Sequence, residues 1–263
     1  MKPIATPAEP PCLAAWRAEH PTASWQDFKT ATRDTPEGAR GCARAVWETL
    51  IESQHGLCAF CEIELAQPYA LWSQVEHWHP KDPARYPGHN WGLDFANMMA
   101  GCEGGERDKP ATERSLPPIK ETQHCGPAKG NEDYTSVLLD PRRDVPLAVP
   151  LWTFDANGNM RVHPAAPPAL ITRAEETMRL LNLHSTVLKR LRSQLWTELE
   201  NDVQQVWEEL GGAEEDFLRA YDCVAAEHLA LAGNRLHRFW STIRSYLGAS
   251  AETWIAAHPE VYA

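Results

Sequence analysis

Four cysteines in the first half of the chain have the residue type and the spacing of a metal site. Cys58 and Cys61 form a Cys-x-x-Cys knuckle, and Cys102 and Cys125 follow in the same part of the sequence. A knuckle lets two thiolates reach one zinc ion, and a closed structural zinc site needs four ligands at about 2.3 Å. The Cys-x-x-Cys pair alone would equally suit a thiol redox motif or two buried thiols. With the two further cysteines, the pattern favours zinc.

A second group of reactive residue types lies between the two halves of this cysteine set. Glu76 and His77 are adjacent, Pro80 follows them, and Asn97 precedes Cys102. This order resembles the HNH nuclease motif. In that motif the histidine takes a proton from water as general base, and its acidic neighbour holds a divalent metal that neutralises the scissile phosphate. A histidine suits this role because its ordinary pKa of about 6.5 leaves it mostly neutral near pH 7.

Longer stretches of the same region carry a more specific resemblance. They are residues 54–62, residues 75–81, Tyr86-Pro87 with Trp91 and Asn97, and residues 124–131, continued by residues 139–141, Asn157-Gly158 and residues 177–183. Together they resemble the PtuB-like proteins, the HNH nucleases of Septu-type and retron-associated anti-phage systems, whose partner is an ABC-type ATPase. The resemblance covers most of residues 40–195.

This resemblance implies a role for each matching residue. The four cysteines would hold a structural zinc ion that pins a ββα-metal hairpin to its helix. His77 would be the general base, Glu76 a ligand of a catalytic Mg²⁺ or Mn²⁺ ion, and Asn97 would orient the loop that carries His77 through a backbone hydrogen bond. The family also implies DNA as the substrate and an ABC-type ATPase subunit as the partner in a defence complex.

The third HNH position departs from the common pattern. There a His or Asn directly follows the last cysteine, three residues before a lysine. Here Gly126 occupies that place, with Lys129 in register. The nearest replacement is His124, which this interpretation makes a second ligand of the catalytic metal.

An alternative register is also open, because residues 102–109 mimic the common ending. It places Gly105 where the second cysteine would stand and makes Glu106 the metal ligand. It leaves Cys125 without a role, and a zinc site that lacks one thiolate must recruit water or another ligand. We therefore prefer Cys125, which makes residues 103–123 a charged, proline-containing insertion.

The elements that must position these residues follow from hydrophobic periodicity and from glycine stops. A helix is predicted over residues 37–54 with a stop at Gly56, and a β-hairpin over residues 151–163 around Asn157-Gly158. Helical patterns follow from Leu170, over 187–210, 217–229 and 236–247. We expect an α+β, mostly helical protein with four parts, which are an N-terminal helical segment (1–50), the HNH module (51–135), a small hairpin region (136–168) and a C-terminal helical region (169–263).

Composition limits the classes of protein to consider. The chain has 263 residues, of which 43% are hydrophobic and 23% charged, so it can bury a core and is not mostly disordered. It shows no apolar run of membrane-spanning length and no apolar N-terminal signal, which predicts a cytoplasmic protein that does not use a membrane. In that reducing compartment Cys12, Cys42 and Cys223 are expected to be isolated free thiols.

Charge bears on how nucleic acid would be held. The formal net charge is −11, which excludes tight binding of nucleic acid through the field of the whole surface. Residues 51–130 contain eleven acidic against seven basic residues, so the module itself should attract phosphate poorly. We therefore expect dependence on a partner. Two alternatives stay open, a zinc-containing adaptor without catalytic activity and a thiol redox protein that uses Cys58 and Cys61.

Overall fold

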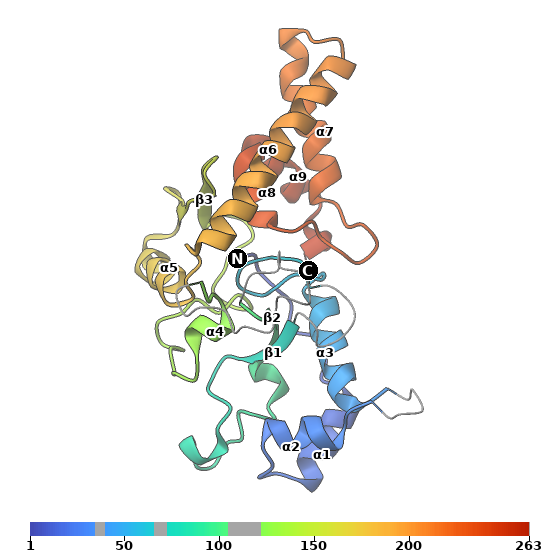
Figure 1. Cartoon of the computed structure of the whole chain (residues 1–263). Coiled ribbons are helices and arrows are strands. Elements are labelled where there is room, and N and C mark those ends of the chain that lie inside the picture. The colour runs from blue at the N-terminus through green and yellow to red at the C-terminus, as the bar shows by residue number, and fades with distance from the viewer. Residues whose placement is uncertain (35–39, 66–72, 105–121, 263) are drawn as a thin grey trace.

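The computed structural model describes residues 1–34, 40–65, 73–104 and 122–262. Two small antiparallel sheets lie among many helices, which confirms the mostly helical α+β class (Figure 1). The strands are β1 (Ser73–His77), β2 (Met98–Cys102), β3 (Trp152–Phe154) and β4 (Met160–Val162). The helices are α1 (Pro11–Glu19), α2 (Trp25–Ala31), α3 (Cys42–Ser53), α4 (Gly126–Lys129), α5 (Pro168–Leu180), α6 (Thr186–Glu209), α7 (Phe217–Leu229), α8 (Trp240–Leu247) and α9 (Ala249–Ala257).

The elements form three levels along the molecule (Figure 1). Helices α1 and α2 lie at one end, and α6 and α7 project together at the other. Strands β1 and β2 with helix α4 lie between them. One continuous hydrophobic core runs through all three levels. The predicted boundaries between the four parts of the chain stay predictions.

Helix α3 leads directly into the cysteine knuckle. Its buried face consists of Ala43, Val46, Trp47, Leu50 and Ile51, as the periodicity predicts. The predicted start at residue 37 lies outside the described residues. The helix ends at Ser53, and the chain then takes positive φ angles at His55 (+54°) and Gly56 (+79°). This turn redirects the backbone so that Cys58 follows the helix end at once.

Cys12 and Cys42 form a disulfide, so the expectation of isolated thiols at these two positions is wrong. Cys12 lies in α1 and Cys42 begins α3, and the packing of these two helices brings the Cα atoms to 5.9 Å. The pairing is a tertiary contact between residues 30 positions apart, and the local sequence gives no sign of it. Cys223 is a free, exposed cysteine, as expected.

Strands β1 and β2 form the hairpin that carries the catalytic candidates. They pair antiparallel with Glu76 opposite Met99 and His77 opposite Met98. Gln54 fastens this hairpin to the knuckle, because its buried side chain donates to Leu57 O and Ala100 O and accepts from Ala100 N. Helix α4 follows Cys125 and completes the local arrangement of two strands and a short helix.

The predicted hairpin of residues 151–163 is confirmed by β3 and β4. Trp152 pairs with Val162 and Phe154 with Met160. The turn contains Gly158 at φ +71°, and the Asp155 carboxylate accepts hydrogen bonds from the backbone of Asn157 and Asn159. An Asn-Gly turn with positive φ was the basis of the prediction.

The C-terminal helices agree with the predicted pattern except at the end of the chain. Helix α6 is capped by the Ser185 hydroxyl and ends just before Gly211-Gly212, as expected. The helix predicted over 236–247 begins only at Trp240, and α9 was not predicted. Only Ala251 and Ile255 of α9 are buried, so its apolar periodicity is weak. In the described ranges no helix has both the length and the apolar character to cross a membrane.

Candidate functional site

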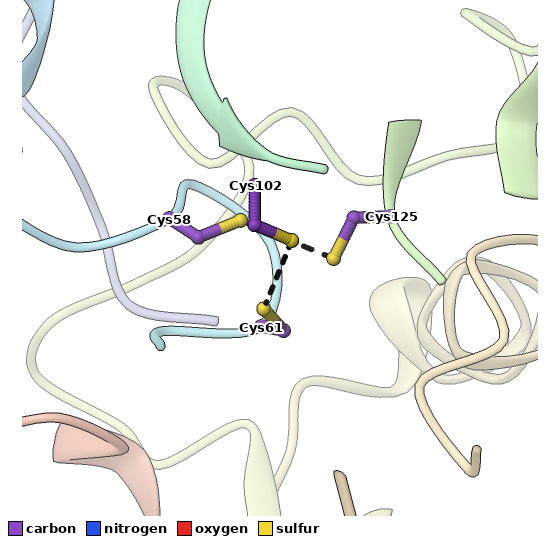
Figure 2. A group of neighbouring side chains, drawn as sticks. All are labelled: Cys58, Cys61, Cys102 and Cys125. Atoms are coloured by element: carbon purple, nitrogen blue, oxygen red, sulfur yellow. Dashed lines mark hydrogen bonds between the residues drawn. The ribbon is translucent and has the colours of Figure 1, made fainter. Parts of the chain in front are cut away.

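The four cysteines predicted to bind zinc come together in one buried cluster (Figure 2). All four sulfur atoms lie within 4.8 Å of one another. The Sγ atoms of Cys58 and Cys125 are 3.9 Å apart, and those of Cys61 and Cys102 are 3.7 Å apart. A tetrahedral zinc site with Zn–S distances of about 2.3 Å has sulfur–sulfur distances of about 3.8 Å. The cluster therefore has the size of a tetrathiolate zinc site.

Backbone contacts bring the four sulfurs together from separate segments. The knuckle closes through Cys58 N to Ile63 O, and it is tied to β2 through Ala59 N to Ala100 O. Cys102 is the last residue of β2. Cys125 has a φ of +57° and donates its N–H to Leu181 O, which turns its side chain toward the knuckle.

The thiols interact strongly enough to separate their pKa values. Burial alone raises the pKa of a thiol, yet the close polar groups of Cys102, Cys125, Cys58 and His124 hold the pKa of Cys61 well below its ordinary value. The pKa of Cys125 is raised well above its ordinary value, first by burial. Four thiols this close can all ionise only against a cation, so the donor set fits a bound Zn²⁺ ion.

His124 lies at this cluster and not at Glu76. The ring is fully buried, and it is close enough to Cys61 to lower the pKa of that thiol. The contact falls short of a hydrogen bond, and Nε2 has no partner among the described residues. Nδ1 lies 3.4 Å from Thr122 O. The structure thus places His124 beside the cysteines, and it does not line the cavity that Glu76 and His77 share.

Glu76 and His77 line one cavity of about 610 Å³. Its wall combines residues of three segments that are distant in sequence. They are the start of α2 (Ser24, Trp25, Gln26), β1 with the following loop (Gln74 to His77, Pro80 to Pro83), and α4 with the following turn (Gly126, Pro127, Lys129 to Asn131). The two predicted catalytic residues are therefore together in an open cavity, next to a closed cysteine cluster.

Glu76 is held in a cradle made by two glycines. A Cβ atom at Gly126 would lie 1.7 Å from Glu76 Oε1, and one at Gly101 would lie 2.5 Å from Glu76 Cγ. The carboxylate fills the space that a larger side chain at position 126 would need. Gln74 Nε2 donates to Glu76 Oε1 at 2.6 Å.

The electrostatics of Glu76 suit a divalent cation. Burial raises the pKa of this carboxyl group, and the nearby charges of Lys129 and Lys81 lower it only in part. In the described part of the chain Glu76 forms no ion pair. A buried carboxylate without a direct counter-ion at the wall of an open cavity fits Mg²⁺ or Mn²⁺, which commonly bind through one or two carboxylates, substrate phosphate and water.

His77 is fixed by its neighbours. Its Nε2 lies 3.1 Å from Gly92 O, and because a carbonyl oxygen only accepts, the ring proton is on Nε2 and the lone pair on Nδ1. Trp25 packs edge-on against the imidazole at 5.3 Å between ring centroids. Burial, together with the charges of Lys81 and Lys129, lowers the pKa of His77 to about 3. The imidazole is therefore neutral, the form that a general base requires.

Asn97 hydrogen-bonds the loop that follows His77. Its Oδ1 accepts from His79 N at 2.7 Å, and its Nδ2 donates to His79 O at 3.0 Å and to Trp91 O at 2.8 Å. Its own carbonyl accepts from Trp78 N. One buried side chain thus joins the chain after His77 to the segment that returns before β2.

Two features of this site were missed at the level of the sequence. Trp25 comes from the N-terminal segment, which was given no catalytic part. Gly92 supplies the carbonyl that orients His77. Lys129 was identified, but its Nζ is buried and donates to His77 O at 2.7 Å. Residues 105–121, which include Gly105 and Glu106 of the alternative register and most of the insertion, lie outside the described residues.

Comparison with known proteins finds a relative for part of this chain. Over 105 residues it is 31% identical to the "Retron Ec83 putative HNH endonuclease" of Escherichia coli. The match covers 40% of this chain and 38% of that protein, so the chain spans well under half the length of the relative. No family model matches the sequence. The similarity to a retron-associated HNH endonuclease agrees with the motif order of residues 58–125 and supports a nuclease.

Proposed function

We propose that this chain is a metal-dependent HNH endonuclease that hydrolyses phosphodiester bonds of DNA as the nuclease of a PtuB-like, Septu-type or retron-associated anti-phage complex. The observation that carries the proposal is the placement of Glu76 and His77 on one open cavity, directly beside a closed tetrathiolate cluster. The similarity to a retron HNH endonuclease supports the same assignment.

The side chains around the cavity have distinct parts in the proposed mechanism. A divalent ion held by Glu76 would supply charge stabilisation at the scissile phosphate. His77 accepts the proton of the attacking water at Nδ1, because Nε2 is held by Gly92 O. Lys81 adds a positive charge at the cavity wall, and Asn97 keeps the loop after His77 in place. His124, at the cysteine cluster, has no part in this mechanism.

A partner is needed to hold the substrate in this proposal. The HNH region has an excess of acidic residues, and residues 196–229, which include most of the projecting helices, contain ten acidic residues against one arginine. Phosphate repulsion by these surfaces leaves DNA with few places to bind. We assign this task to an ATPase subunit. Efficient cleavage of plasmid DNA at physiological salt by the purified chain alone would contradict this part of the proposal.

One observation favours a second candidate, an adaptor that has kept the zinc site but not the catalysis. Gly126 offers no side chain as a further metal ligand. The two functions differ in their response to metal, because only the nuclease requires a divalent ion for cleavage.

A thiol redox role for Cys58 and Cys61 would require two free thiols, and stoichiometric zinc that resists mild chelation would exclude it.

The test is cleavage of DNA by the chain with its ATPase partner, with and without His77→Ala. We expect a loss of about 10²- to 10⁴-fold in rate, which is the usual contribution of a general base. Zinc content and the circular dichroism spectrum should stay at wild-type values. His89→Ala is the matched control, because His89 is half-exposed and pairs with Asp94 outside the cavity. Full activity of His77→Ala, or loss of its zinc, would refute the assignment.

A further inference from the structure

Arg192, on helix α6, is a buried cation without a carboxylate partner. Only 2% of the surface of this residue is exposed to solvent. One nitrogen, Nη1, donates to Leu183 O at 2.7 Å, but Nε has no partner in the described structure. The guanidinium packs against the rings of Phe154 and Phe239, at 5.2 and 5.8 Å from their centroids. An uncompensated charge in such surroundings is strongly destabilising.

The other buried arginine of the described ranges is treated differently. Arg244 is 5% exposed and forms an ion pair with Glu252 at 2.7 Å. No such ion pair is made by Arg192 with any described residue. A guanidinium this deeply buried must therefore be balanced by negative charge of another kind.

Backbone contacts place Arg192 beside the cysteine cluster. Leu183, whose O accepts from Arg192 Nη1, lies two residues after Leu181, whose O accepts from Cys125 N. Phe239, whose ring packs against the guanidinium, donates its N–H to Glu62 O, next to Cys61. Burial lowers the pKa of Arg192 to about 10, and charges on Cys61, Glu62 and Cys125 act in the opposite direction. Glu62 already has a cation partner, because its carboxylate forms an ion pair with the Met1 ammonium group at 2.9 Å, and it also accepts from Ser241 N and Ser241 Oγ. Cys61 and Cys125, when a bound metal ionises them, are thus the remaining source of negative charge for Arg192 in the described structure.

Zinc changes the charge that Arg192 faces. Four neutral thiols carry no charge, whereas four thiolates with one Zn²⁺ ion carry a formal charge of −2. Basic and N–H groups next to metal-bound sulfur stabilise such a centre and tune its affinity for the metal. The fully buried His124, whose Nε2 also lacks a partner, lies on the same cluster. Two buried N–H-bearing side chains without full partners at one cluster point to an anionic, metal-loaded state.

We propose that Arg192 is the counter-charge of the tetrathiolate zinc centre, so that zinc binding at the knuckle and docking of helix α6 stabilise each other. The inference rests on the cysteine cluster holding zinc and does not depend on nuclease activity. Helix α6 runs from the centre of the molecule into the projecting arm (Figure 1). Loss of zinc would leave Arg192 uncompensated and loosen the inner end of this helix.

The experiment combines substitution with removal of zinc. Arg192→Met keeps an apolar side chain of similar length between the two rings and removes the charge, and Arg190→Met is the control on an exposed position of the same helix. Zinc release to a chromogenic chelator is followed in the purified full chain. We expect Arg192→Met to release zinc about 10- to 100-fold faster, the usual effect of losing an outer-shell partner, and Arg190→Met to behave as wild type.

The sign of the stability change separates charge compensation from simple packing. With zinc bound, Arg192→Met should lower the thermal midpoint. Without zinc the same substitution should leave it unchanged or raise it, because it removes an uncompensated buried cation. Equal destabilisation with and without zinc, or wild-type zinc release, would overturn the proposal.

A measurement on the wild-type chain decides the matter if Arg192→Met does not fold. Hydrogen exchange is compared in residues 186–195 and in α9, before and after zinc is stripped. We expect faster exchange in residues 186–195 while α9 changes little. No change in residues 186–195, or an equal increase in both segments, would contradict a coupling specific to α6. Neither outcome depends on DNA cleavage, so failure of the nuclease proposal is recognised separately.

Discussion

The cysteine cluster and the cavity of Glu76 and His77 are neighbours, but the cluster is closed and the cavity is open. All four sulfurs are buried and face one another, so the chain supplies a complete ligand set. The cavity has a volume of about 610 Å³ and offers the carboxylates of Glu76 and Asp82 beside a histidine and two lysines. Closed sites of four protein ligands hold structural metals, whereas catalytic metals keep positions open for water and substrate. The comparison therefore separates a site that fits a structural ion from a site that fits a catalytic ion.

The two sites are also mechanically connected. Cys102 ends the strand that pairs with β1, and Cys125 directly precedes Gly126, whose missing side chain makes room for Glu76. The positions of the cavity residues thus depend on the cysteine cluster. The cluster does not depend on the cavity in the same way, because no residue that lines the cavity supplies a sulfur ligand. Changes at the cluster should damage both sites, and changes at the cavity should damage only one.

The largest effect is expected for Cys102→Ser. Zinc binding contributes about 10–16 kcal/mol to the folding of small zinc modules, so loss of one thiolate should remove zinc and lower the thermal midpoint by more than about 10 °C. Metal analysis and calorimetry measure both quantities. Cys223→Ser, at an exposed thiol outside the cluster, should change neither. Retention of one zinc per chain by Cys102→Ser would contradict the view that all four cysteines form one closed zinc site.

Asn97→Ala should have the next largest effect, confined to the cavity. It leaves His79 N, His79 O and Trp91 O without their hydrogen-bond partner, at a cost of about 1–3 kcal/mol in the free energy of unfolding. Cleavage should fall, because the loop after His77 loses its link, while zinc stays bound. Thermal unfolding with metal analysis measures this, with the exposed Asn201→Ala as control. Loss of zinc together with cleavage would show that the two sites are not separable.

Gly126→Ala tests the border between the two sites. Its Cβ would lie 1.7 Å from Glu76 Oε1, and because the carboxylate ends a flexible side chain, it should move aside without unfolding the protein. Cleavage should fall about 10- to 100-fold from this displacement. Ala128→Ser on the same helix should stay near wild type. Wild-type cleavage rates for Gly126→Ala would mean that the position of Glu76 does not matter.

Acid should affect the two sites differently, and the protonation of His77 should change least. The pKa of His77 is lowered to about 3 by burial, so its imidazole stays neutral from pH 8 to 5, whereas an exposed histidine titrates near 6.5. The unfolded chain takes up that proton below about pH 6.5, so this group lowers stability as the pH falls. Zinc thiolates lose metal in acid. Histidine NMR should show no titration of His77 in this range, and a midpoint near 6.5 would contradict the burial.

The sequence was sufficient for the residues that share local patterns. The Cys-x-x-Cys knuckle, the Glu76-His77 pair and the Asn157-Gly158 hairpin are short-range signals, and four cysteines in one region indicated a common cluster. The long helix α6 followed from its apolar stripe and glycine stop. Such features depend on neighbours in sequence, which a single chain displays directly.

What the sequence did not provide depends on packing between distant segments. The disulfide of Cys12 with Cys42 requires α1 to lie against α3, and Trp25 reaches His77 across more than 50 residues. The location of His124 at the cysteines and the burial of Arg192 against Phe154 and Phe239 likewise require the folded chain. From the sequence, Gly126 is a position where a metal ligand is missing. Only the structure shows that the Glu76 carboxylate occupies the space of the absent side chain.

The most direct test follows zinc content and DNA cleavage in one sample of the chain with its partner, first after mild EDTA treatment and then after addition of Mg²⁺. We expect one zinc per chain to survive chelation, cleavage to stop, and Mg²⁺ to restore it. Cleavage that continues in EDTA, or that is lost only together with the zinc and returns only with it, would contradict a closed structural ion beside an open catalytic one.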